Sequence, residues 1–145
     1  MKKLSPYLTF AGTIPFIACA ILITMHIDAV IAMGKTAEIL STYGLVIATF
    51  MAGSQWGSHL VLTEDNPWAL KLPIFSNLIT IILWLGFLTL SEGGFLWLLL
   101  IGFICLFIID YTLNEDGIIT DKYLKSRKYV TVIVIISLII SAMQL

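Results

Sequence analysis

The sequence predicts an all-α integral membrane protein, a bundle of five transmembrane helices. Of its 145 residues, 59% are hydrophobic and 12% are charged, roughly half the charged share of a soluble domain. The mean hydropathy is +1.02, and a soluble core of this size could not cover so much apolar surface. The charges fall between apolar runs long enough to cross a bilayer as helices, which takes about 20 residues.

Charge-free runs define the helices, which form one membrane domain over residues 1–145. Pro15 interrupts the first run, which argues against a cleaved signal peptide there. The segment Ser91-Glu-Gly-Gly94 is a tight turn, so the third and fourth helices are expected to be antiparallel neighbours. The expected helices cover residues 5–25, 39–63, 71–91, 94–113 and 129–145, and residues 114–128 form an interfacial loop beside the headgroups.

Basic residues are distributed unequally between the two ends of this bundle. Lys35 stands alone at one end, whereas the other end holds Lys2, Lys3, Lys71, Lys122, Lys125, Arg127 and Lys128. The positive-inside rule therefore predicts a cytoplasmic N-terminus and a C-terminus outside, in the periplasm. One fixed orientation also argues against dual topology.

Small residues recur at helical spacing along the second helix. Two rows are expected to pack against another helix: Gly44, Ala48 and Ala52, and beside them Gly53 and Gly57. Small side chains let helices approach closely in lipid. Gln55 and His59 continue the first row toward the cytoplasm, so they are expected to face protein.

Polar side chains from four helices are expected at similar depth, forming a polar cup open to the cytoplasm. The candidate ligand-binding residues are Thr13, Gln55, Trp56, His59, Asn77 and Asp110. Ionisable groups at membrane depth are rare and are functional candidates, and His59 and Asp110 are expected to share the site. The alternatives are a headgroup-level position for Asp110, interhelical hydrogen bonding by Gln55 and Asn77, and simple packing of Trp56.

Several chemistries lack a pattern in this chain. Cys19 and Cys105 lie in apolar runs and form no CxxC pair, and His26 and His59 are expected near opposite faces of the membrane. No metal-ligand spacing, catalytic triad or nucleotide fingerprint is present, and no basic run with aromatics suggests nucleic acid. We expect no catalytic residues, metal or cofactor, and an enzyme is unsupported.

Four stretches together resemble the family of small membrane proteins grouped with mitochondrial transmembrane protein 69. These are "GTIPF" at Gly12–Phe16, "YGLVIATFMAGSQWG" at Tyr43–Gly57, Asp110, and "YLKSRKYVT" at Tyr123–Thr131. The sequence departs from the family pattern at Ala52, where a glycine is expected. The resemblance implies a five-helix protein of the bacterial inner membrane, without an assigned reaction.

Three functions remain open at this stage. The leading hypothesis is a non-enzymatic protein that binds a small molecule, lipid headgroup or ion in the polar cup. The alternative is an assembly partner that docks another membrane protein through the small-residue face of the second helix. A small transporter is third, because the chain lacks the inverted repeat common in transporters.

Overall fold

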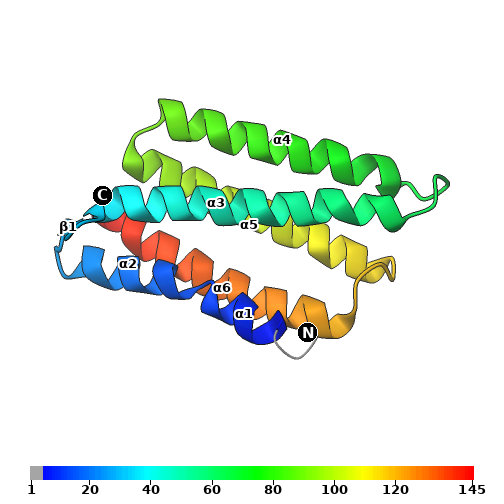
Figure 1. Ribbon diagram of the computed structural model, residues 1–145, viewed down its shortest axis with the longest axis horizontal. Helices are drawn as coiled ribbons and strands as arrows, with labels where there is room; N and C mark the ends of the chain where they lie inside the picture. Colours follow the sequence, from blue (N-terminus) through cyan, green and yellow to red (C-terminus); the bar gives the residue numbers. More distant parts are fainter. Residues whose placement is uncertain (1–4) are drawn as a thin grey trace.

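Helices of membrane length lie side by side in the computed structural model, which describes residues 5–145 (Figure 1). The elements are α1 (Ser5–Ala11), α2 (Ile14–Thr24), β1 (Ala29–Val30), β2 (Gly34–Lys35), α3 (Thr36–Ser58), the 3₁₀ turn η1 (His59–Val61), α4 (Trp68–Thr89), α5 (Glu92–Glu115) and α6 (Asp121–Gln144). Five spans are long and apolar enough to cross a membrane: α1 with α2, α3 with η1, α4, α5 and α6. The prediction of a five-span membrane protein is confirmed to that extent.

The first span is broken into α1 and α2 at Gly12 and Thr13. Pro15 explains the break, because its ring has no N–H and clashes with the carbonyl four residues earlier. Side-chain hydroxyls bond two backbone carbonyls next to the break, and such donors matter where the surroundings are apolar. The Tyr43 hydroxyl on α3 donates to the Gly12 carbonyl at 2.9 Å, and the Thr13 hydroxyl donates to the Phe10 carbonyl at 2.6 Å.

The connections fall at two opposite ends of the bundle (Figure 1). One end carries the start of α1 and the α3–α4 and α5–α6 connections, and we call it the N-terminal end. The other end carries the hairpin of β1 and β2, the α4–α5 turn and the C-terminus. This arrangement matches the predicted grouping of loops, although Lys2 and Lys3 lie outside the described residues.

The predicted interfacial loop at 114–128 is wrong over most of its length. Helix α5 continues to Glu115 and α6 begins at Asp121. Gly117, at a φ of +76°, ends α5 in a left-handed conformation that suits glycine. Thr120 caps α6 by accepting a hydrogen bond from the Tyr123 backbone N–H at 3.2 Å. The basic residues of the expected loop therefore occupy the first turns of a membrane-length helix.

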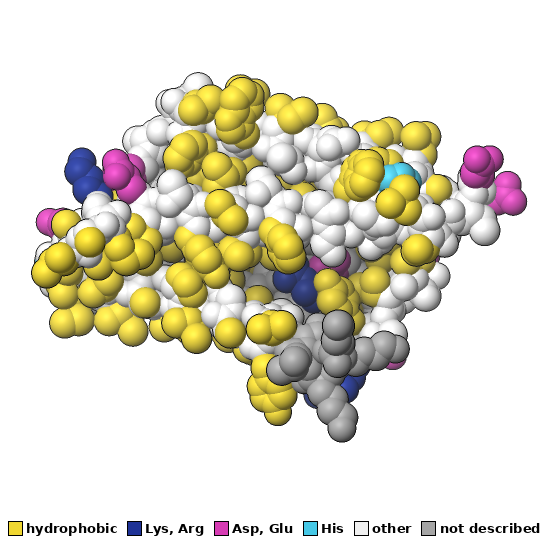
Figure 2. Space-filling view, viewed as in Figure 1, with side chains coloured by type: hydrophobic (Ala, Val, Ile, Leu, Met, Phe, Trp, Pro, Cys, Tyr) yellow, Lys and Arg dark blue, Asp and Glu magenta, His cyan; other side chains and the backbone are white. Residues whose placement is uncertain are grey.

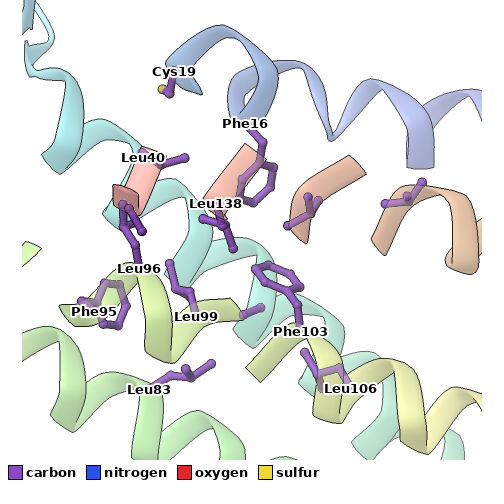
Figure 3. Close-up of a cluster of buried hydrophobic side chains, with 14 of the residues drawn as sticks. Phe16, Cys19, Leu40, Leu83, Phe95, Leu96, Leu99, Phe103, Leu106 and Leu138 are labelled. Atoms are coloured by element: carbon purple, nitrogen blue, oxygen red, sulfur yellow. The ribbon is translucent and has the colours of Figure 1, made fainter. Parts of the chain in front are cut away.

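Helix α5 supplies much of the buried core (Figure 3). Its Leu96, Leu99 and Leu106 are fully buried against residues of α2, α3, α4 and α6. Leu99 fits over Gly44 of α3 so closely that a Cβ at position 44 would lie 2.6 Å from the Leu99 Cδ1. The absence of a side chain at Gly44 thus sets how near α3 and α5 approach each other.

Candidate functional site

A carboxylate is buried inside the bundle near its N-terminal end. Asp110 is 3% exposed and lies on α5 five residues before Glu115, where the helix ends. At 1.5 Å per residue, this places it about 7–8 Å inside the end of the helix. An unpaired charge at such depth would be costly, so the groups that surround Asp110 are the first question about the site.

The partner of Asp110 is Arg127 of α6. The Arg127 Nε donates to the Asp110 Oδ2 at 2.9 Å, and the side chains are 6% and 5% exposed respectively. A second Arg127 nitrogen, Nη1, lies 3.5 Å from the Met51 sulfur. The two opposite charges cancel, so the pair adds no net charge to an apolar region.

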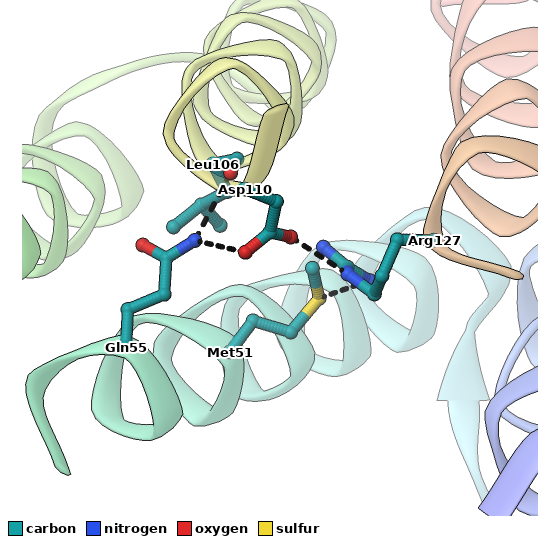
Figure 4. Close-up of polar contacts among 5 residues, drawn as sticks. All are labelled: Met51, Gln55, Leu106, Asp110 and Arg127. Carbon is teal, nitrogen blue, oxygen red and sulfur yellow. Dashed lines mark hydrogen bonds and ion pairs between the residues drawn. The ribbon is translucent and has the colours of Figure 1, made fainter. Parts of the chain in front are cut away.

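Gln55 of α3 completes the arrangement from the other side (Figure 4). Its Nε2 donates to the second carboxylate oxygen, Asp110 Oδ1, and to the Leu106 carbonyl, each at 3.0 Å. Both oxygens of Asp110 are therefore engaged, one by an amide and one by a guanidinium. The network joins α3, α5 and α6 at one level of the bundle.

A cavity of about 180 Å³ lies beside this network, and we call it the side cavity. Its walls come from α1, α2, α3, α5 and α6, and most of them are apolar. The polar lining residues are Thr9, Thr13, Ser54, Gln55, Asp110, Tyr123, Arg127 and Thr131. Figure 2 shows a hollow on the flank of the bundle, between α3 and α1, with an acidic and a basic side chain visible inside. The cavity thus opens sideways, across the direction of the helices.

Three of the predicted ligand-binding residues line the side cavity: Thr13, Gln55 and Asp110. Trp56 and His59 are not among its lining residues. The α-helix ends at Ser58, and His59 is partly exposed there, whereas Gln55 is buried. Among the described residues, His59 contacts Trp56, through the Trp56 carbonyl and ring, whereas Asp110 bonds Gln55 and Arg127. No described hydrogen bond or ion pair joins His59 to Asp110, and of the two only Asp110 lines the side cavity.

Asn77 also lies outside the side cavity, on the exposed surface of α4. Its neighbour Ser76 is buried instead, and the Ser76 hydroxyl donates to the Pro73 carbonyl at 3.2 Å. The side chains of consecutive helical residues point about 100° apart. Asn77 and Ser76 therefore lie at nearly the same level of α4 but on different faces of the helix.

The two small-residue rows of α3 behave differently. Ala48 and Ala52 are fully buried, and Gly44 is in close contact with Leu99. A Cβ at Gly53 or Gly57 would meet no atom within 4 Å. Gly53 and Gly57 therefore contact no helix among the described residues, and their packing against another helix stays a prediction.

Arg127 is the functional candidate that the sequence analysis missed, since it was assigned to an interfacial loop. The sequence does hold a local signal for where α6 begins. Thr120 followed by Asp121 is a typical helix start, with a capping side chain and an acid in the first turn. A helix beginning there places Arg127 about 9 Å from its first residue, at a depth close to that of Asp110.

Other chemistry finds no support in this part of the chain. Within residues 5–145, no three His, Cys, Asp or Glu side chains come together as a metal site. Within the network of Gln55, Asp110 and Arg127, both carboxylate oxygens are bonded, whereas the Gln55 Oε1 has no partner among the described residues. What the arrangement offers is a small polar surface at the inner end of an apolar cavity.

Comparison with known proteins gives a family without an assigned activity. The model of the family described as "Protein of unknown function (DUF3429)" matches residues 1–143, so the chain belongs to this family. Comparisons with curated proteins and with solved structures found no significant match.

Proposed function

We propose that this member of the DUF3429 family binds a small amphiphilic molecule, of lipid type, in the side cavity. The observation that carries the proposal is the position of the buried Asp110–Arg127 pair in the wall of a mostly apolar cavity. Binding sites for small molecules combine apolar walls with a few polar groups that orient the ligand. An amphiphile fits this combination, and the flank of the bundle is the direction from which a membrane-dissolved molecule arrives.

A second candidate function is docking of another membrane protein on α3. Gly53 and Gly57 support it, because each leaves open space where the backbone of a foreign helix could approach. Exposed Phe50 and Trp56 flank these glycines. This surface resembles the faces through which membrane helices pack. It does not identify a partner, so we rank the docking function second.

The proposed setting is a bacterial inner membrane with the N-terminal end of the bundle in the cytoplasm. Among the described residues, Lys71, Lys122, Lys125 and Lys128 lie toward that end, whereas Lys35 lies at the other. Arg127 no longer counts toward the charge bias, since it is buried in an ion pair. The remaining bias still favours this orientation, and kinship with mitochondrial transmembrane protein 69 is proposed on the motifs quoted above.

The test is to fill the side cavity and measure what the protein carries. Ser54 lines the cavity, whereas the adjacent Gly53 faces open space. We expect Ser54→Phe to reduce the small molecules that co-purify from native membranes, measured by mass spectrometry, and Gly53→Phe to retain them. Equal retention by both variants would contradict ligand binding in this cavity. Loss of a co-purifying protein from Gly53→Phe alone would favour the docking function.

A further inference from the structure

The side cavity contains a buried hydroxyl without a hydrogen-bond partner. Thr131 of α6 lines the cavity and is 5% exposed. Within the described residues, its Oγ1 makes no hydrogen bond. A buried hydroxyl left without a partner costs free energy, whereas most buried polar groups are satisfied. Thr131 is one turn along α6 from Arg127, so the two residues lie on one face of the helix, and both line the side cavity.

Arg127 also has donor capacity left over. The described interactions occupy its Nε, on Asp110, and its Nη1, on Met51. A guanidinium carries five N–H donors, and no described contact takes those on Nη2. Because Arg127 lines the side cavity, these remaining donors are available to an occupant.

The two carboxylate oxygens beside Arg127 are occupied, which limits the kind of polar group that this part of the site can bind. Asp110 receives Gln55 on one carboxylate oxygen and Arg127 on the other. The Gln55 Oε1 is an unpartnered acceptor, but it points away from Arg127 (Figure 4). The Arg127 Nη2 can only donate, whereas the Thr131 hydroxyl can donate or accept, so an acceptor is the one kind of group that can bind both.

Charge decides which acceptor fits. Asp110 and Arg127 are close enough to cancel, at 2.9 Å. A phosphate or carboxylate headgroup would add a net negative charge to this apolar region, and burying a net charge is costly. A carbonyl oxygen accepts the same hydrogen bonds without adding charge.

We infer that the side cavity binds the neutral carbonyl group of an ester, amide or ketone on an apolar chain, with the oxygen accepting from the Thr131 hydroxyl and the Arg127 Nη2. The apolar chain lies against the walls formed by Phe16, Phe103 and Val134. This inference rests on the proposed function and specifies its ligand class.

The experiment compares three probes of equal chain length on the purified full chain in detergent. Methyl oleate presents a neutral carbonyl, oleate at alkaline pH presents an anion, and an octadecene presents neither. Binding is measured by scintillation proximity with radiolabelled probes. We expect wild-type protein to bind methyl oleate at least about tenfold more tightly than the other two, because only this probe supplies an uncharged acceptor.

Variants at Thr131 assign the contact. Thr131→Val should weaken methyl oleate binding by about fivefold, the usual value of one hydrogen bond, while Thr131→Ser should retain it. Thr49→Val, on α3 and outside the cavity lining, is the matched control, since the Thr49 hydroxyl bonds only its own helix at Val46. This control should bind as wild type does.

The outcomes separate the inference from the function on which it rests. Tighter binding of oleate than of methyl oleate would overturn the neutral-carbonyl inference and leave ligand binding intact. Methyl oleate binding that ignores Thr131→Val would also overturn it. If no probe binds wild-type protein better than the cavity-filled Ser54→Phe variant, and nothing co-purifies with wild type, the proposed function fails as well.

Discussion

Asp110 of α5 and Arg127 of α6 form an ion pair inside the bundle, with 2.9 Å between Oδ2 and Nε. The pair links two helices that also pack along much of their length. Its charges are shielded from water, so each residue depends on the other more than a surface pair would.

Removing one member of the pair should therefore cost more than removing both. Arg127→Met leaves Asp110 buried without a countercharge, and we expect a loss of about 3–5 kcal/mol in unfolding free energy. The double variant Asp110→Asn with Arg127→Met should recover part of that loss. Reversible unfolding in mixed micelles measures both, and additive effects would contradict a direct pair.

The close approach of α3 to α5 predicts different tolerance at two glycines. Gly44→Leu must displace Leu99, whose Cδ1 lies 2.6 Å from the site of a new Cβ, and overpacking of this kind costs about 1–3 kcal/mol. Gly53→Leu meets open space and should be nearly neutral. Thermal unfolding in detergent compares the two, and equal destabilisation would mean that Gly53 is also packed.

The hydrogen bond that spans the break in the first helix gives a third prediction. Tyr43→Phe removes the donor to the Gly12 carbonyl, 2.9 Å away, and leaves that carbonyl in an apolar region. We expect a loss of about 1–3 kcal/mol. Tyr111→Phe is the control, because the Tyr111 side chain is 50% exposed and has no described hydrogen bond. A silent Tyr43→Phe would show that water or lipid satisfies the carbonyl.

The orientation is tested at the two ends of α5. In a background without Cys19 and Cys105, we expect Glu92→Cys to react with an impermeant maleimide in intact cells. Glu115→Cys should react only after lysis. Both glutamates are exposed, so accessibility to the reagent and not burial decides the result. The reverse pattern would invert the proposed topology.

The apolar runs located the membrane spans because charges are excluded from lipid on every face of a helix. They did not locate the start of α6, since a run of charges is typical of a loop and Arg127 escapes that rule through its pairing with Asp110. That pairing joins residues 17 positions apart in the chain, and no local pattern indicates which base meets which acid.

For the polar residues, the position along the helix was predicted better than the face of the helix on which each side chain lies. Gln55 and Asp110 were expected at similar levels, and the structure joins them by a hydrogen bond of 3.0 Å. His59 was placed on the face of Gln55 by assuming that the α-helix continues, whereas the 3₁₀ turn begins at that residue. A constant helical period does not anticipate where the α-helix ends, or that the side chain beyond that point contacts Trp56.

The order of Asp110 and Arg127 along the chain affects how the last helix enters the membrane during synthesis. An arginine costs about 2.5–3.5 kcal/mol at the centre of an inserting helix on translocon scales, and Arg127 lies in the second turn of α6, where the cost is smaller. Asp110 leaves the ribosome first, and Arg127 follows 17 residues later across the short connection between α5 and α6. If α5 and α6 insert as one helical hairpin, each charge enters lipid already neutralised by the other. In that case the ion pair lowers the free-energy cost of placing α6 in lipid, in addition to joining α5 and α6 in the finished bundle.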